Sequence, residues 1–218
     1  MSLRDATALF FSRRNGRVVV AAVAVALVAR LVHGGFGGLD LVVVAAVVAA
    51  QPFVEWTIHV SVLHFRPRSL GRRTVDLPIA RKHRAHHRDP RDVDLVFVPL
   101  PDLLLLLVAI PAGFLLLEPD LGLALTGVLT GYALLAVYEW THFLIHQPYT
   151  PKTRLYRYVR RAHVLHHFRN ENYWFGVTMH LGDHVLRTFP AKDDVPLSPT
   201  ARTLGVEETE TGAETAAA

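Results

Sequence analysis

Four long apolar stretches divide the chain, and they cover residues 18–32, 41–63, 95–117 and 121–145. A transmembrane helix needs roughly 20 apolar residues, within a range of about 17–25. The third and fourth stretches meet that length. The first is short and the second contains Gln51, Pro52 and Glu55, so either of these could be tilted or re-entrant. No stretch alternates with the period of a barrel strand, and the pattern therefore predicts helices in a bilayer.

The composition also indicates a membrane protein. Hydrophobic residues make up 51% of the 218 residues and charged residues only 19%, against about 25% in ordinary soluble domains. We therefore predict the all-α class, as an integral-membrane four-helix bundle with a histidine-rich helical cap on its cytosolic side.

The basic residues predict the orientation of this bundle. Of the 23 Lys and Arg residues, all but Arg30 lie before residue 18, between residues 66 and 94, or after residue 146. The positive-inside rule then places both termini and the loop between the second and third spans in the cytosol, as in a multi-pass protein. A cleaved signal peptide at the SRRNGR run is less favoured, because further spans follow it.

These features divide the chain into three parts. Residues 1–17 are expected to form a cytosolic arm and residues 18–188 a membrane domain. Residues 189–218 end in an acidic run of small residues and are expected to form a disordered tail.

Histidine is unusually frequent, with 13 residues, and all but His33 fall into five clusters. The clusters are His59 and His64; His83, His86 and His87; His142 and His146; His163, His166 and His167; and His180 and His184. Residues three or four apart share one face of a helix, so most clusters can aim their imidazoles at one point. His59 and His64 are five apart, which requires a helix end, a wider turn or two different metals.

The clusters belong to an internal repeat. EWTIHVSVLH precedes HRAHH in the first half, and EWTHFLIH precedes HVLHH in the second. Two such halves facing each other would bring ten imidazoles together, which is enough for two metal ions. Imidazole ligands suit zinc, copper, iron or nickel, and the spacing does not choose among them. The absence of cysteine excludes thiolate-bound zinc and iron–sulfur clusters.

Other residues near these clusters are candidates for supporting roles. Glu55 and Glu139 head the two repeats, where they could orient ligand imidazoles through the distal nitrogen or form interfacial ion pairs. His180 and His184 are weaker candidates for ligation. The bland alternative for the clusters is a solvated basic face attracted to anionic lipid headgroups.

The order HX4H, HX2HH, HX3H, HX2HH resembles the fatty acid hydroxylase and sterol desaturase superfamily of membrane non-haem di-iron enzymes, and most closely its fatty acid 2-hydroxylase branch. The segment NYWFGVT, with Asn172 and the later Asp183, resembles the end of that pattern, although Gly182 stands where the family has Trp. The resemblance covers roughly residues 51–188. It implies metal ligation by His59, His64, His83, His86, His87, His142, His146, His163, His166 and His167.

The same resemblance implies two iron ions, replaceable by zinc, and O2 as co-substrate for hydroxylation of a fatty acyl or related lipid from the bilayer. RRAHVLHH also resembles bacterial carotenoid hydroxylases, so carotenoid or sterol hydroxylation or desaturation is an alternative. A haem-binding or metal-transport protein is the non-enzyme alternative, but it would place histidines within the spans.

The reaction also needs electrons that the substrate does not supply. Without cysteine or a GxGxxG fingerprint, the chain should depend on a separate ferredoxin or small cytochrome that docks on its basic cytosolic face. No nucleic-acid partner is expected.

Overall fold

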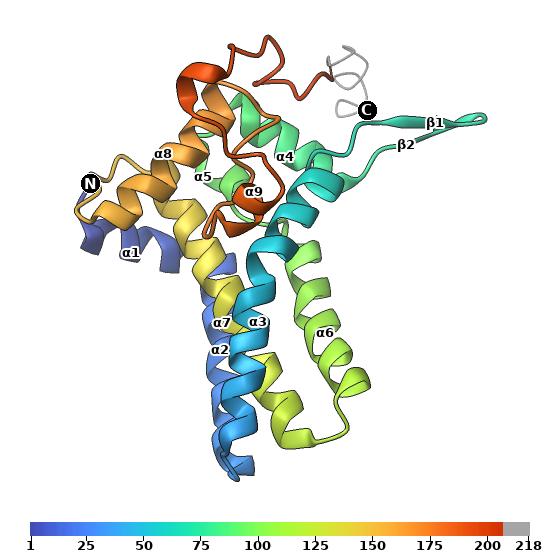
Figure 1. Ribbon diagram of the computed structural model, residues 1–218, viewed down its shortest axis with the longest axis vertical. Helices are drawn as coiled ribbons and strands as arrows, with labels where there is room; N and C mark the ends of the chain where they lie inside the picture. The colour runs from blue at the N-terminus through green and yellow to red at the C-terminus, as the bar shows by residue number, and fades with distance from the viewer. Residues whose placement is uncertain (207–218) are drawn as a thin grey trace, which may run out of the picture.

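The computed structural model describes residues 1–206. Within them, four helical segments are long and apolar enough to cross a membrane, and they form the lower part of the molecule in Figure 1. The segments are α2 (Arg14–His33), α3 (Gly38–Ile58) with a π-helical turn η1 (His59–Leu63), α5 (Val93–Val96) with α6 (Leu100–Leu117), and α7 (Leu121–His146). The predicted all-α membrane fold is confirmed, and the two doubtful stretches form helical segments of 20 and 26 residues.

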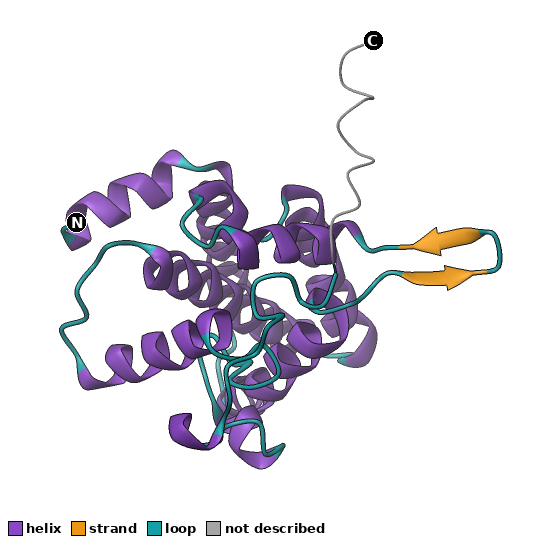
Figure 2. Cartoon of the chain, turned by 90° about the horizontal axis from the view of Figure 1, so that it is seen from above, coloured by secondary structure: helices purple, strands orange, loops and turns teal. Residues whose placement is uncertain are grey.

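The remaining elements lie at one end of the bundle and form the cap (Figure 1). They are α1 (Leu3–Ser12), β1 (Arg68–Leu70), β2 (Arg73–Val75), α4 (Pro78–Arg88), α8 (Arg154–Phe168), α9 (Leu181–Val185) and a 3-10 turn, η2 (Lys192–Asp194). The antiparallel strands β1 and β2 form a hairpin that projects away from the helices (Figure 2). Gly71 has a positive φ of 61° at its turn, a conformation that suits glycine.

Helix α7 packs against α2, α3 and α6. Gly127 permits the close approach of α6, because a Cβ at this position would lie 2.4 Å from the Phe114 ring. The Tyr132 hydroxyl of α7 donates a hydrogen bond to the Leu107 carbonyl of α6 at 2.5 Å. The helix that carries His142 and His146 is therefore held on three sides.

A buried ion pair joins three spans at the end away from the cap. Arg30 of α2 is 1% exposed, and its guanidinium donates to Asp40 of α3 and to Thr126 of α7, each at 2.6 Å. Asp40 therefore neutralises the single basic residue that departs from the charge pattern.

Replacing Arg30 by Met should lower the unfolding temperature in detergent by several degrees, because the Asp40 carboxylate would stay buried without its cation. The double variant Arg30→Met/Asp40→Leu removes both charges and should recover most of that loss. Melting followed by circular dichroism measures both effects. Equal melting of the single variant and the wild type would show that this pair does not stabilise the bundle.

Residues 1–17, predicted as a cytosolic arm, contain helix α1 and the start of α2. Helix α1 packs on the cap through Ala6 and Phe10, which are buried against Phe97 and Phe143, and α2 begins at Arg14. Apolar residues at helical spacing give α1 a face to bury, so it folds onto the spans.

Residues 189–206 likewise differ from the disordered tail expected from residue 189. Val195 and Leu204 are each 2% exposed, and the Ser198 amide donates to the Arg169 carbonyl at 2.8 Å. The prediction of disorder depends on the acidic composition of the last residues, and it gives no weight to buried apolar residues such as Val195 and Leu204. The rest of the expected tail, 207–218, lies outside the described residues.

Candidate metal centre

Ten histidines form two groups of five where the spans meet the cap. The first group contains His59, His64, His83, His87 and His166. The second contains His86, His142, His146, His163 and His167. In each group, one nitrogen per residue lies within 4.8 Å of the other four. The groups adjoin, because the His87 and His167 rings stack with centroids 4.1 Å apart.

The two halves of the repeat exchange one histidine each. His86 lies on α4 in the first half, but it belongs to the group built by α7 and α8. His166 lies on α8 in the second half, but it joins the group built by η1 and α4. The middle histidine of each HxxHH motif therefore crosses to the opposite centre, and neither half completes a centre alone.

The π-helical turn η1 explains how His59 and His64 share one centre. The His64 amide donates to the His59 carbonyl at 3.0 Å, which is the i→i+5 pattern of a π-helix. This wider turn brings residues five apart onto one face, and their ring centroids lie 4.8 Å apart. Of the explanations considered from the sequence, the wide turn is the one observed.

The unpaired nitrogens fit a metal-binding role. Buried nitrogens without a hydrogen-bond partner among the described residues occur in His64, His86, His87, His142, His163, His166 and His167. Other imidazole nitrogens face each other closely: His59 Nε2 and His83 Nε2 are 3.2 Å apart, and His146 Nε2 and His163 Nε2 are 3.0 Å apart. Two nitrogens bound about 2.1 Å from one metal lie roughly 3.0–3.4 Å apart, so these pairs already have ligand spacing.

Burial keeps the cap imidazoles in the neutral form that binds metals. It lowers the pKa of His83, His86, His163, His166 and His167 well below the ordinary value, and neighbouring histidines lower it further. For His87, burial lowers the pKa to about 3. A neutral imidazole keeps a lone pair for a metal at physiological pH.

Backbone carbonyls, rather than carboxylates, orient several of these rings. His59 Nδ1 donates to the Phe175 carbonyl at 2.5 Å and His166 Nδ1 to the Tyr173 carbonyl at 2.8 Å. His87 Nδ1 donates to the Ala201 carbonyl at 2.9 Å. A carbonyl partner fixes the tautomer and turns the other nitrogen toward the metal. Residues 169–206 therefore orient histidines of the two groups, although none of the ten lies in this segment.

Glu55 and Glu139 each act through a loop. Glu55 accepts hydrogen bonds from the Val177 and Thr178 amides and from the Thr178 hydroxyl, and so holds the loop after α8. Glu139 accepts from the Val98 amide at 3.1 Å, in the short loop between α5 and α6. Pro99 disfavours a helical conformation at Val98, so the Val98 amide is available to donate to Glu139 rather than to a helical carbonyl. Each glutamate thus anchors the loop of the opposite half.

The remaining candidates lie outside the two groups. Asp183 accepts hydrogen bonds from the Phe175 and Gly176 amides and from His180, so it shapes the loop that contacts His59. His184 is exposed and pairs with the Tyr158 hydroxyl at 2.9 Å. Asn172 is exposed and hydrogen-bonds to Asn170.

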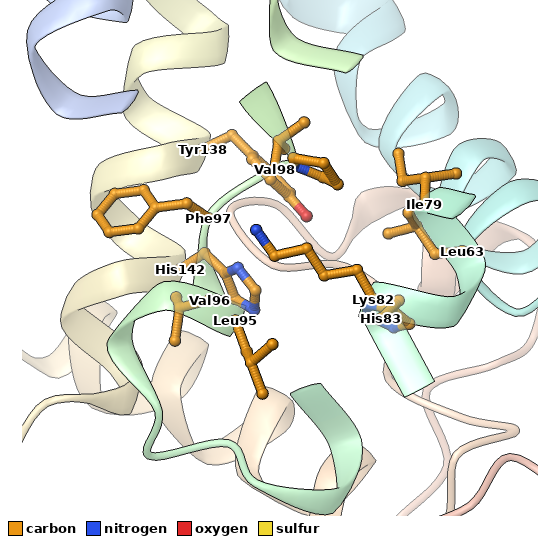
Figure 3. A pocket seen from close by; sticks show the side chains of 11 residues that line it. Leu63, Ile79, Lys82, His83, Leu95, Val96, Phe97, Val98, Tyr138 and His142 are labelled. Carbon is orange, nitrogen blue, oxygen red and sulfur yellow. The ribbon is translucent and has the colours of Figure 1, made fainter. Parts of the chain in front are cut away.

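An apolar pocket opens onto both groups (Figure 3). His83 of the first group and His142 of the second line it, with Leu63, Phe97 and other apolar side chains around them. Its other polar groups are the Lys82 ammonium, which points toward the Tyr138 hydroxyl, and Tyr138 itself. Neither residue belongs to the histidine pattern of the sequence, although Lys82 precedes His83 and Tyr138 precedes Glu139.

Known proteins are similar to this chain in sequence. The family model described as fatty acid hydroxylase matches residues 44–188. The dihydroceramide fatty acyl 2-hydroxylase FAH2 of Arabidopsis thaliana is 31% identical over 68% of this chain and 60% of its own length. The fatty acid 2-hydroxylase of Mus musculus is 32% identical over 66% of this chain and 38% of its own length. The chain thus spans less than two thirds of these relatives.

A solved structure has the same fold. It is described as full-length Scs7p with only the hydroxylase domain visible, and it superposes with a TM-score of 0.65 at 24% sequence identity. The match covers 84% of this chain and 66% of that chain.

Proposed function

The chain belongs to the fatty acid hydroxylase family, and from this premise we propose that it inserts an oxygen atom from O2 into a C–H bond of a membrane lipid acyl chain. One observation carries the proposal: an apolar pocket at the membrane end of the cap meets two adjoining groups of five imidazoles. The names of the relatives support a fatty acyl substrate.

The two groups of histidines would hold two iron ions, which zinc can replace. All ten ligands are imidazoles, a donor set that suits both metals. Bound iron would supply the activation of O2. The residues of this chain hold the neutral imidazoles in place, and the carbonyls of Phe175, Tyr173 and Ala201 fix their orientation.

The pocket would position the substrate. Leu63, Ile79 and Phe97 line this pocket, and they would contact the end of an acyl chain that enters from the bilayer and shield it from water. His83 and His142 both line the pocket, so a carbon held there would lie near both groups of histidines. We place this site on the cytosolic face, because the basic residues gather at that end of the spans.

The test is a comparison of lipids from cells that produce the protein with those from cells that produce a ligand-deficient variant, His86→Ala. Mass spectrometry should find acyl lipids heavier by one oxygen only with the wild type. Oxygenated pigments or sterols instead would favour the carotenoid or sterol alternative. Identical profiles would contradict a hydroxylase.

A separate electron donor is part of the proposal. We expect an acidic ferredoxin or cytochrome to dock on the exposed basic residues of the cap, among them Arg72, Arg73 and Arg161. Arg160 is a poor probe because its Nε donates to the Ile145 carbonyl.

Replacing Arg72, Arg73 and Arg161 together by Gln should slow turnover with a reduced acidic carrier severalfold at low salt and flatten the salt dependence. Stopped-flow reduction across a salt series measures both. The control is Glu118→Gln, a charge change at the opposite end of the spans. The same rate and slope in the triple variant would contradict docking there, and turnover with NAD(P)H alone would contradict a separate donor.

A further inference from the structure

A second hollow lies beside the apolar pocket that His83 and His142 line, which we call the metal-facing pocket. The volume of the second hollow is about 400 Å³, and Lys82 and Phe97 line both spaces. We call it the basic hollow, because it is also lined by Arg13, Arg14 and Arg17 and contains a single carboxylate, that of Asp94.

The positive charge of the basic hollow is only partly neutralised. Arg13 pairs with Asp94 at 2.6 Å, and both side chains reach solvent. Arg17 donates to the carbonyls of Phe11 and Ser12, which carry no net charge. Arg14 is exposed. The side chains that line the hollow therefore carry an excess of three positive charges, which attracts an anion.

Lys82 links the basic hollow to the metal-facing pocket. It precedes His83 on α4, and its side chain runs along the apolar pocket with the ammonium toward Tyr138 (Figure 3). Within residues 1–206 it forms no ion pair and no hydrogen bond. A half-buried ammonium in apolar surroundings is costly unless a ligand supplies an acceptor.

The basic hollow lies at the depth of lipid headgroups. Arg14 begins the span α2 and Leu100 begins the span α6, and both residues line the hollow. Cationic side chains at such a boundary meet the polar groups of lipids. A lipid could therefore keep its head in the basic hollow while its acyl chain enters the apolar pocket.

We propose that the basic hollow selects a lipid substrate with an anionic head group, a carboxylate or a phosphate, and that Lys82 binds this group at the entrance of the metal-facing pocket. This specificity rests on the proposed function. An uncharged head group would leave Lys82 without a partner, whereas an anion would accept charge-assisted hydrogen bonds from Lys82 and the arginines. Lys82 would also set how far the chain reaches toward His83 and His142.

The experiment compares lipids that carry the same kind of acyl chain but differ in their head groups: a free fatty acid, a phosphatidic acid, a diacylglycerol and a ceramide. Each is presented in phosphatidylcholine vesicles to the metal-loaded protein. Oxygenated product gives KM and kcat, and displacement of a fluorescent fatty acid gives affinity without turnover. The expected result is tighter binding and a lower KM for the two anionic lipids. If the free fatty acid has the lower KM, the preferred head group is a carboxylate, and if the phosphatidic acid has the lower KM, it is a phosphate.

Variants test the residues. Lys82→Met should raise KM for the anionic lipid about 10-fold or more and change kcat less, because a hydrogen bond to a charged group is lost. Arg14→Gln, at an exposed position, should raise KM in the same direction. Lys192→Met is the matched control, since Lys192 is exposed on η2, outside the hollow.

The outcomes separate the two proposals. Equal KM for neutral and anionic lipids, or an unchanged KM in both Lys82→Met and Arg14→Gln, would overturn the anion site while oxygenated product still supports the hydroxylase. Preferential binding of anionic lipids, lost in Lys82→Met, without product from any lipid would support the anion site and overturn the proposed function.

Discussion

Replacing His86 by Ala should remove metal from the centre otherwise formed by the second half of the repeat, and should reduce activity to background. His86 is 1% exposed and neither of its nitrogens has a hydrogen-bond partner among the described residues, so both nitrogens are available to a metal. His166→Ala should have the matching effect on the other centre. Each variant should lose about one metal equivalent, measured by elemental analysis of the purified protein.

Double variants test the exchange of ligands between halves. His86→Ala/His142→Ala damages one centre twice and should keep close to one metal per chain. His86→Ala/His59→Ala damages both centres and should keep close to none. If each half held its own metal, the two results would be reversed. His33→Ala, at the opposite end of the spans, should keep both metals and serves as the control.

The second large effect concerns Glu55. Its carboxylate holds the Val177 and Thr178 amides, and the same loop presents the Phe175 carbonyl to His59. Glu55→Ala should therefore weaken metal binding in the first group about 10–100-fold, the usual range for residues that support ligands. Glu139→Ala should act in the same way on the second group through the loop at Val98.

The glutamine variant distinguishes this role from a direct one. In Glu55→Gln, the side-chain amide oxygen could still accept from both backbone amides, and the side-chain NH2 could donate to the Thr178 hydroxyl oxygen. This variant should therefore keep most of the metal affinity. Chelator competition measures the affinity of each variant. A loss as large in Glu55→Gln as in Glu55→Ala would indicate that the negative charge itself acts on the imidazoles.

Much of the fold and most of the metal site can be predicted from the chain because both depend on local periodicity. Apolar length alone predicts the spans, since a bilayer requires every backbone group to bond within its own helix. The spacing of HxxHH predicts that each trio shares a face. The repeat of Glu55 and Glu139 before paired histidines indicates two related halves.

The partners across these halves cannot be derived in this way. In the sequence, Arg30 is an exception to the charge pattern. Only the packing of α2 against α3 shows its partner, because it brings the Asp40 carboxylate to 2.6 Å from the Arg30 guanidinium. Glu55 and Thr178 are 123 positions apart, and only folding places one beside the other. Backbone carbonyls, which orient His59, His87 and His166, carry no residue type that a pattern can reveal.

The exchange of His86 and His166 between the centres has the same origin. Helical periodicity defines the face that a histidine occupies, but the packing of α4 and α8 against the spans defines which neighbours that face meets. Likewise, the sequence gives Lys82 no distinction from the other basic residues near His83, and only the fold places it in a pocket with Tyr138 and His142. Residue spacing and hydrophobicity thus determine the helices and the faces that their histidines occupy. Which residues pair across the fold depends on contacts between distant segments.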